Sequence, residues 1–581
     1  MAGLGRRIIV NQQKKTSSEA ESGELSAGLR RFLYLTATIT GAVILIVEIL
    51  GAKMLSPFLG TSHFVWTAQI AVTLVALSAG YFVGGWVVDR SPRLNFLYFS
   101  ILGAAVYLAA TVPMVRPICF KLMKLPLEWA SLFASAFLFL IPLALLAMTG
   151  PFLVRVLTQD VEKVGGNMGR LTAISTLGSV AGAVLIGYVL IPHFPNSVTM
   201  LITAGVLVAL AAVYFMVWGR NESAVTGLVV AGLLVAGLGH SGLRGQFSDT
   251  MKYGGLTWKV LYRANSNYGE LLVIEYREGE NVERRYLNDQ LIQNTYDPGT
   301  GQSRALFSGA LRWLAHAYTP RLDSALCIGM GVGIVPMQLA ADGVAVDVAE
   351  INGAVVPMAE KHFGFNSSMV NVVVSDGRQF LNQSDKQYDA IILDAFLGDS
   401  TPSHLMTQEA FTSIREHLSA TGVLVINCFG ESTDQRQFFA ASLDKTLRSV
   451  FVGKHRVTVH ASGQGNVFFV ATRADKLVKH RPPAAPNTEA RERMAGLVED
   501  SAIRTEWYTW WQQANGTGPF FSEHSQMQEE LGLVWKKERV YDDPKAGSIL
   551  LDDFNPVEFH DAHNREANRR GLMNYLQSTD G

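Results

Sequence analysis

The sequence predicts a chain in two parts: a bundle of about seven transmembrane α-helices, then a Rossmann-like α/β domain with a small N-terminal β-unit. Three observations predict this organisation. Nearly all the long apolar runs lie before about residue 243, whereas most charged residues follow it. The second part alternates short apolar strands with helical segments, which is typical of a mostly parallel sheet covered by helices. A glycine-rich turn follows the first of those strands, as in nucleotide-binding sheets.

The composition of the chain argues against a nucleic-acid partner and for partial immersion in lipid. The 581 residues carry a formal net charge of −1, so the basic excess typical of nucleic-acid binding is missing. Only 17% of the residues are charged, and the mean hydropathy is +0.19. The cysteines are widely spaced without a CxxC pair, so we expect neither a disulfide framework nor a bound metal. They are Cys119, Cys327 and Cys428.

The N-terminal part begins with a polar basic tail, residues 1–31, which lacks the apolar core of a signal peptide. Seven apolar segments follow, each near the roughly 20 residues that a bilayer requires. They span residues 32–54, 65–88, 96–115, 130–157, 171–191, 197–218 and 224–238. The seventh segment is short and glycine-rich, so it is the weakest span. The loop 84–93 weakly resembles the cytoplasmic loop motif of the major facilitator superfamily, which would make the helical block transport-like.

From about residue 244 the pattern changes to that of a β-unit and an α/β domain. Strand-like composition over 261–276 and 284–292 predicts a small antiparallel β-unit. Seven later strands predict a mostly parallel sheet that closes with one antiparallel pair. These strands are 324–328, 344–351, 370–375, 388–393, 422–427, 457–460 and 466–472. The predicted domains are 1–31, 32–243, 244–310, 311–480 and a C-terminal extension, 481–581.

The glycine-rich turn carries the first candidate site residues. Gly329, Gly331 and Gly333 follow the strand 324–328 and open a helix, and such a turn lets the backbone approach a ligand closely. Glu350 lies 21 residues after Gly329, near the end of the next strand. An acidic side chain at that position can accept hydrogen bonds from ribose hydroxyls. Together these residues predict a nucleotide site.

Two further strands end in aspartate, at Asp376-Gly377 and at Asp394. Aspartate is common where strands end because it caps turns. The carboxyl ends of parallel strands, however, meet at one edge of the sheet. We therefore expect both carboxylates to lie in one cleft with the glycine turn and Glu350.

These residues resemble the spermidine synthase (polyamine aminopropyltransferase) family, and more closely its membrane-fused members, over roughly residues 262–471. The most specific matches are Asp394-Ala395-Phe396, Pro402-Ser403-His404-Leu405, Thr407-Gln408-Glu409-Ala410 and Leu551-Asp552-Asp553-Phe554-Asn555-Pro556. The resemblance implies the Rossmann-like fold shared by methyltransferases and spermidine synthases. It also implies that Glu350 holds the ribose and that Asp376, followed by Gly377, meets the adenine amino group. Gln293, in the segment 289–293, would lie near the cofactor.

The activity that the resemblance implies is aminopropyl transfer from an S-adenosylmethionine-derived donor to an amine. Asp394 would be the catalytic aspartate that orients the amine and receives its proton, with Asp399 or His404 as helpers. The expected co-substrate is decarboxylated S-adenosylmethionine or S-adenosylmethionine. The expected partners are an amine or polyamine substrate and the lipid bilayer, with a homodimer as a possible assembly.

Departures from the family pattern keep two other hypotheses open. Val332 replaces the aspartate of the family's Gly-Gly-Gly-Asp-Gly turn. An aspartate there would repel the carboxylate of intact S-adenosylmethionine, so valine leaves methyl or aminocarboxypropyl transfer open. The family's Tyr-His-Glu segment is not recognisable around 307–311, which leaves polyamine specificity open as well. The remaining hypothesis is a non-catalytic nucleotide or polyamine sensor coupled to a transport-like helical block.

The orientation of the chain in a cell (inner) membrane follows from its basic residues. A cytoplasmic N-terminus places the basic tail and most loop Lys and Arg residues on the inner side, as the positive-inside rule requires. Seven crossings then place the C-terminal domain outside the cytoplasm. Adenosyl-sulfonium donors, however, are made inside it. The charge pattern favours the extracytoplasmic face, and donor supply favours the cytoplasmic one.

Overall fold

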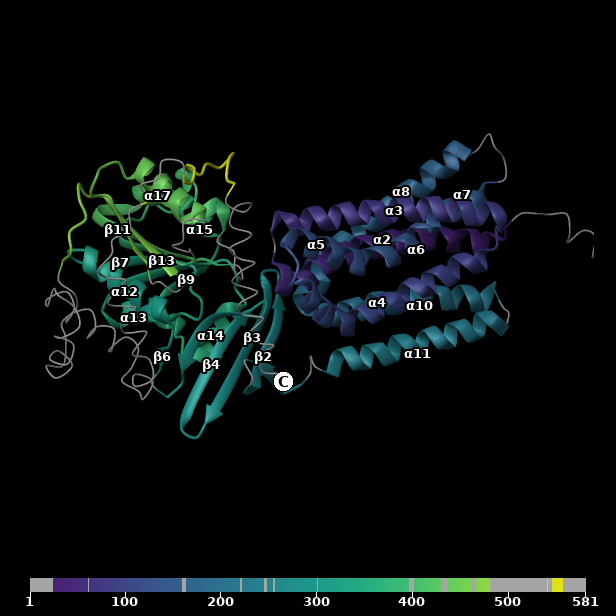
Figure 1. Ribbon diagram of the computed structural model, residues 1–581, viewed down its shortest axis with the longest axis horizontal. Helices are drawn as coiled ribbons and strands as arrows, with labels where there is room; N and C mark the ends of the chain where they lie inside the picture. Colours follow the sequence, from purple (N-terminus) through teal and green to yellow (C-terminus); the bar gives the residue numbers. More distant parts are fainter. Residues whose placement is uncertain are drawn as a thin grey trace, which may run out of the picture.

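The computed structural model describes residues 25–60, 62–158, 164–219, 222–244, 248–253, 256–299, 301–396, 402–429, 437–461, 466–480, 541 and 546–556. Asp399, most of the basic tail and most of the C-terminal extension lie outside these ranges. Figure 1 shows an elongated helical block at one end, an α/β domain at the other, and the strands β2 and β3 between them.

The helical block contains, among the described residues, seven helices or helix series that are long and apolar enough to cross a membrane. They are α2 (Ala27–Leu59), α3 (His63–Arg90), α4 (Leu94–Leu122), the series α5 to α7 (Leu127–Leu157), the series α8 to α9 (Val164–His193), α10 (Asn196–Val217) and α11 (Glu222–Arg244). Their buried apolar side chains form one continuous core. The short seventh segment of the sequence is therefore part of a 23-residue helix, α11.

The β-unit is a six-stranded antiparallel sheet in which each strand pairs with its neighbour in the chain. Its strands are β1 (Thr250–Tyr253), β2 (Leu256–Ser266), β3 (Gly269–Glu278), β4 (Asn281–Asn288), β5 (Leu291–Asp297) and β6 (Gln302–Ser303). Short turns connect β2 to β3 and β4 to β5. These two turns lie at the same end of the sheet, because β3 pairs with both β2 and β4.

The α/β domain is built on a seven-stranded mixed sheet with the order β12-β13-β11-β10-β7-β8-β9. The strands are β7 (Ser324–Ile328), β8 (Ala345–Glu350), β9 (Asn371–Val374), β10 (Tyr388–Leu393), β11 (Leu418–Phe429), β12 (Val457–Ala461) and β13 (Asn466–Thr472). β7 to β11 are parallel to one another. The sequence predicted one antiparallel pair, but β13 runs antiparallel to both β11 and β12.

Helices cover both faces of this sheet (Figure 1). The helices are α12 (Leu306–Tyr318), α13 (Ile334–Ala341), α14 (Val355–Phe363), α15 (Gly377–Asn382), α16 (Gln408–Glu416) and α17 (Phe438–Val450). Successive strand residues face opposite cores, as the two-residue period of a strand requires. In β7, Cys327 belongs to the core under α12 to α14, whereas Leu326 and Ile328 belong to the core under α16 and α17. The strand order reverses on either side of β7, which is where open α/β sheets bind ligands.

Candidate active site

A cavity of about 250 Å³ lies at the carboxyl edge of the mixed sheet, beside the β7–β10 reversal point. The ends of β7, β8, β10 and β11 form its floor, and residues of the β-unit form one of its walls. Most of the predicted site residues line it. They are Gln293, Gly329, Gly331, Glu350, Asp376, Gly377, Asp394 and His404.

The glycine turn is the part of the site where side chains have no room. Gly329 and Gly331 have φ angles of +85° and +53°, in the left-handed region that favours glycine. A Cβ on Gly329 would collide with the carbonyl oxygen of Asp394, and one on Gly331 would lie 2.6 Å from Asn294 Oδ1. Gly333 caps α13 and does not line the cavity. Gly333 was predicted to contact a cofactor, but it lies behind the turn and has a structural role there.

Glu350 joins the glycine turn to the end of β8. Its Oε2 accepts a 3.1 Å hydrogen bond from the Met330 amide, and its Oε1 accepts a 2.7 Å bond from the Asn352 amide. Burial raises the pKa of Glu350, and these two backbone hydrogen bonds oppose the rise. A carboxylate offers about four acceptor positions. Two therefore remain on Glu350 for hydroxyl groups of a ligand.

Asp376 caps a helix with one carboxylate oxygen and contacts His404 with the other. One oxygen, Oδ1, caps α15 by accepting the Arg378 and Gln379 amides at 2.9 and 3.0 Å. The other, Oδ2, lies 2.8 Å from Nε2 of His404. Burial favours a higher pKa for Asp376, but the hydrogen bonds from His404 and the two amides hold it below its usual range. Asp376 therefore presents an ionised carboxylate at one end of the cavity.

Asp394 follows β10 at the floor of the cavity and has a strongly shifted pKa. Burial raises its pKa to about 6, against the opposing effect of a hydrogen bond from Asn427. Asn427 Nδ2 donates to Asp394 Oδ1 at 2.9 Å, and Asn466 Nδ2 donates to Asn427 Oδ1 at 2.9 Å. Both asparagines line the cavity. This chain of amides fixes the orientation of a carboxyl group that can gain and lose a proton near neutral pH.

Asn427 is a site residue that the sequence interpretation missed. It lies near the end of β11, in the same position relative to its strand as Asp394 has after β10. The rule that selected Asp376 and Asp394, polar residues at the carboxyl ends of parallel strands, therefore selects Asn427 as well.

The positions of His404 and Val332 do not fit the roles predicted for them, as helper of Asp394 and as determinant of the donor. His404 was expected to assist Asp394, but its ring bonds to Asp376. The side chain of Val332 is 1% exposed, belongs to the core under α12 to α14 and does not line the cavity. The argument from Val332 to an intact donor therefore has no support in the position of this side chain.

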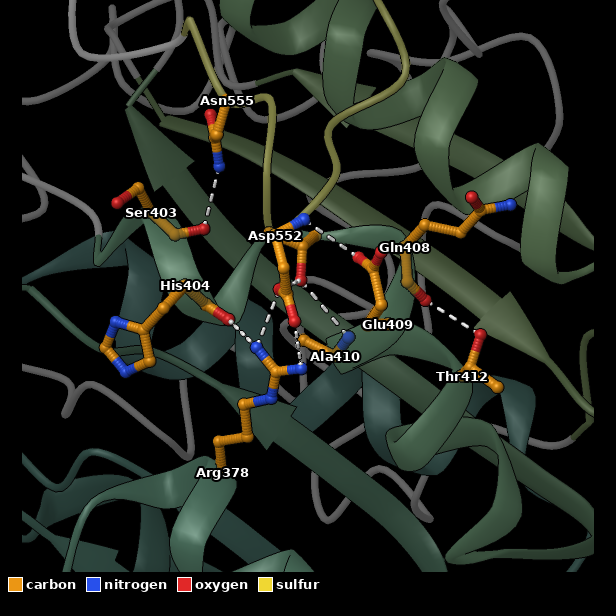
Figure 2. Close-up of polar contacts among 10 residues, drawn as sticks. Arg378, Ser403, His404, Gln408, Glu409, Ala410, Thr412, Asp552 and Asn555 are labelled. Carbon is orange, nitrogen blue, oxygen red and sulfur yellow. Dashed lines mark hydrogen bonds and ion pairs between the residues drawn. The ribbon is translucent and has the colours of Figure 1, made fainter.

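Residues 546–556, which we call the strap, return from far along the chain to the loop that carries His404. Figure 2 shows Asp552 of the strap paired with Arg378 of α15 through two contacts of 2.7 and 2.6 Å. The other Arg378 contact, at 3.4 Å, is to the His404 carbonyl. Thr407, at the end of the same loop, donates a 2.7 Å hydrogen bond to Asp552. The strap thus connects α15 to the loop on the cavity rim.

Two further contacts hold the strap itself in place. Asn555 donates a 2.9 Å hydrogen bond to the Ser403 carbonyl (Figure 2). Leu550 is fully buried in the core under α16 and α17. Pro402, His404 and the adjacent Leu405 line the cavity, so the strap supports one side of the site without entering it.

Comparisons with known proteins show what the C-terminal half of the chain is similar to. Residues 337–480 match the model of the spermine/spermidine synthase domain. A polyamine aminopropyltransferase of Vibrio vulnificus is 31% identical over 189 residues, which cover 30% of this chain and 60% of the relative. A probable polyamine aminopropyl transferase of Bifidobacterium longum is 25% identical over 322 residues, covering 53% and 65% of the two chains.

Among solved structures, the spermidine synthase of Thermotoga maritima matches at 18% identity with a TM-score of 0.33, over 49% of this chain and 94% of that one. The present chain spans less than two thirds of the two curated relatives, 60% and 65% of their lengths. The matched domain contains Glu350, Asp376 and Asp394, the three carboxylates of the cavity. The C-terminal half of this chain is therefore similar to spermidine synthases, and the match to the family model is confined to residues 337–480.

Proposed function

We propose that this protein is a membrane-bound transferase that moves an aminopropyl group from an adenosyl-sulfonium donor to an amine. The observation that carries the proposal is the meeting of three different carboxylates in one cavity. Glu350 has free acceptor positions suited to ribose hydroxyls, and Asp376 has a lowered pKa. Asp394 is buried with a pKa of about 6. Two carboxylates can therefore bind a nucleoside while the third exchanges a proton.

The chemistry is an in-line displacement at the methylene carbon next to the sulfonium. The neutral nitrogen of the acceptor forms a bond to that carbon, and the carbon–sulfur bond breaks with its electron pair going to sulfur. A neutral thioether leaves, and the new ammonium gives one proton to Asp394 or to solvent. The protein must hold nitrogen and carbon about 3–3.5 Å apart. Asp394, fixed by Asn427, is placed to orient the amine and take that proton.

The charge of the cavity favours decarboxylated S-adenosylmethionine as the donor. Its described lining includes Glu350, Asp376 and Asp394 but no lysine or arginine. The carboxylate of intact S-adenosylmethionine would enter this lining without a lysine or arginine to pair with, which is costly in a partly dry site. The decarboxylated donor brings an ammonium into the same acidic lining without that carboxylate. We therefore place the intact donor second.

We also propose that the helical block anchors the protein in the cell membrane with a cytoplasmic N-terminus. Seven helices with enough length and apolar character support this proposal, together with the positive-inside bias of the loops. An odd number of crossings would carry the catalytic domain to the extracytoplasmic face. Labelling of a Glu280→Cys variant with an impermeant reagent, in intact cells and in lysates, distinguishes the two faces because the β3–β4 turn is exposed.

The proposed donor can be tested by calorimetry on the full chain in detergent. We expect methylthioadenosine and decarboxylated S-adenosylmethionine to bind at least about tenfold more tightly than S-adenosylmethionine, since one unpaired carboxylate costs about 1–3 kcal/mol. Equal affinity for the two donors would favour methyl or aminocarboxypropyl transfer over aminopropyl transfer. Absence of binding by all three compounds at millimolar concentration would contradict nucleotide binding altogether.

The strap leads to a second prediction, on nucleotide affinity. Asp552→Asn removes the charge that pairs with Arg378, so the loop around His404 loses part of its support. Because this ion pair is partly exposed, we expect methylthioadenosine affinity to fall only about threefold. The neighbouring Asp553, which is also exposed, supplies the matched control Asp553→Asn. Equal affinities of the two variants would show that the strap does not support the site.

A further inference from the structure

The end of helix α2 contacts both hairpin turns of the β-unit. Lys53 Nζ donates a 2.8 Å hydrogen bond to the Asn267 carbonyl, in the β2–β3 turn. Ser56 Oγ donates a 2.5 Å hydrogen bond to Asp289 Oδ2, in the β4–β5 turn. The Ser56 side chain is buried, with 3% of its surface exposed. A helix of the apolar block is therefore joined to the two turns by polar contacts, one of them partly buried.

These turns are also part of the cavity wall. Tyr268 and Asn288, each one residue from a turn residue that α2 contacts, line the cavity. The two are joined to each other, because Asn288 Nδ2 donates a 3.2 Å hydrogen bond to the Tyr268 carbonyl. Asp289 Oδ1 accepts a 2.9 Å hydrogen bond from the Glu270 amide. This bond ties the β4–β5 turn to β3, the strand that follows the β2–β3 turn. The wall and the contacts with α2 thus form one hydrogen-bonded unit.

The β4–β5 turn adopts a backbone conformation that its residues do not favour. Asp289 and Gln290 have φ angles of +46° and +66°, where glycine or asparagine is the usual choice. The Gln290 side chain donates a 2.7 Å hydrogen bond to Glu270 Oε2. Such conformations persist where surrounding contacts hold them, and the bond from Ser56 is one of those contacts.

We propose that Lys53 and Ser56 are positioning residues of the transferase site, which they do not touch. By holding the two turns, the end of α2 sets the distance between the β-unit wall and the floor that carries Asp394. This inference rests on the proposed function. It assigns the helical block a part in catalysis: the wall keeps its shape only while α2 is seated against the turns.

The test uses the full chain in detergent, with decarboxylated S-adenosylmethionine and putrescine as probe substrates. Ser56→Ala and Lys53→Met should each raise the KM for putrescine about tenfold, the usual loss from one charge-assisted hydrogen bond. The Kd of methylthioadenosine should change less than about threefold, since Glu350 and Asp376 belong to the other sheet. Lys53→Arg keeps a donor at that position and should restore the KM.

A matched control breaks a different contact between the same two parts of the chain. Asn265 Nδ2 donates a 2.9 Å hydrogen bond to the Phe194 carbonyl, and its side chain does not line the cavity. Asn265→Ala should therefore leave the KM unchanged. If Ser56→Ala behaves like Asn265→Ala, the inference is wrong.

Hydrogen exchange separates failure of this inference from failure of the proposed function. Peptides that cover residues 286–293 should exchange faster in Ser56→Ala than in wild type and in Asn265→Ala, whatever the substrate. Absence of turnover in wild type would speak against the proposed function alone. Unchanged exchange in Ser56→Ala would overturn the positioning role.

Discussion

Replacing Asp394 with asparagine is expected to lower turnover by a factor of about 10³, in the middle of the range for loss of a general base. The amide keeps the size of the carboxyl group but cannot take a proton from the acceptor amine. Binding of methylthioadenosine should stay within about twofold of wild type, because this change leaves the hydrogen bonds of Glu350 and Asp376 intact. Calorimetry and a turnover assay on the same preparation measure the two quantities.

The pH dependence of wild type gives an independent check on Asp394. Burial raises its pKa to about 6, so the basic form is scarce below that pH. We expect turnover to rise about tenfold per pH unit below pH 6 and to level off above it. Asp394→Asn should lose this dependence.

The Asp394 carboxyl affects stability in the opposite direction, because ionisation that raises turnover lowers the free energy of unfolding. The folded chain holds the proton of Asp394 more tightly than the unfolded chain, so the free energy of unfolding falls as the pH rises from about 4 to about 6. Above pH 6 the buried charge costs roughly 3 kcal/mol. Asp394→Asn should therefore unfold at the same temperature as wild type at pH 8, or at a higher one.

Asp385, exposed in the loop before β10, provides the control variant Asp385→Asn, which should match wild type in turnover. Full turnover of Asp394→Asn would remove the catalytic role of Asp394, whereas absence of turnover in wild type together with nucleotide binding would favour the sensor hypothesis. A large loss of nucleotide binding in that variant would mean that Asp394 belongs to the donor site.

Glu350→Gln should weaken methylthioadenosine binding about 100-fold. Glu350 accepts two backbone amides with its two oxygens, whereas glutamine has a single acceptor oxygen. The NH₂ group of the glutamine would face either the Met330 or the Asn352 amide, donor against donor. The glycine turn would lose its anchor, and the ligand would lose its ribose contacts. Calorimetry measures the affinity directly.

Glu280→Gln, at the exposed β3–β4 turn, serves as the control for this change and should bind like wild type. Thermal unfolding of both variants shows whether Glu350→Gln remains folded. Wild-type affinity in a folded Glu350→Gln variant would rule out the role of this carboxylate in the nucleotide site.

The parts of the site that could be predicted from the sequence are those that follow from one strand and the turn after it. Gly329, Glu350, Asp376 and Asp394 all stand at such positions, and the parallel sheet brings them to one edge because its strands share a direction. Asn427 follows the same rule, but it was not selected from the sequence, because its side chain is a neutral amide. Val332 shows the limit of motif comparison, since the side chain at a matching position faces the core.

The remaining contacts depend on packing between segments that are far apart in the chain. Ser56 and Asp289 are separated by 233 residues, and Arg378 and Asp552 by 174. Neither pair has a local pattern, because each partner is an ordinary polar residue whose contact depends on a distant segment. The exact edges of the sheet depend on similar pairing: β13 could have joined one antiparallel neighbour or two, and the lengths of the strands allow both.

The position of the strap has a consequence for the biosynthesis of the protein. Ribosomes add about 5–20 residues per second, so Asp552 emerges roughly 10 to 35 seconds after Arg378, its partner 174 residues earlier. Leu550 follows the end of α17, Val450, by 100 residues, so the space that it fills between α16 and α17 is uncovered for about 5 to 20 seconds. The helices of the N-terminal block have by then all been synthesised. The α/β domain therefore keeps apolar surface available to chaperones, after all the N-terminal helices have been made, until Leu550 completes its core.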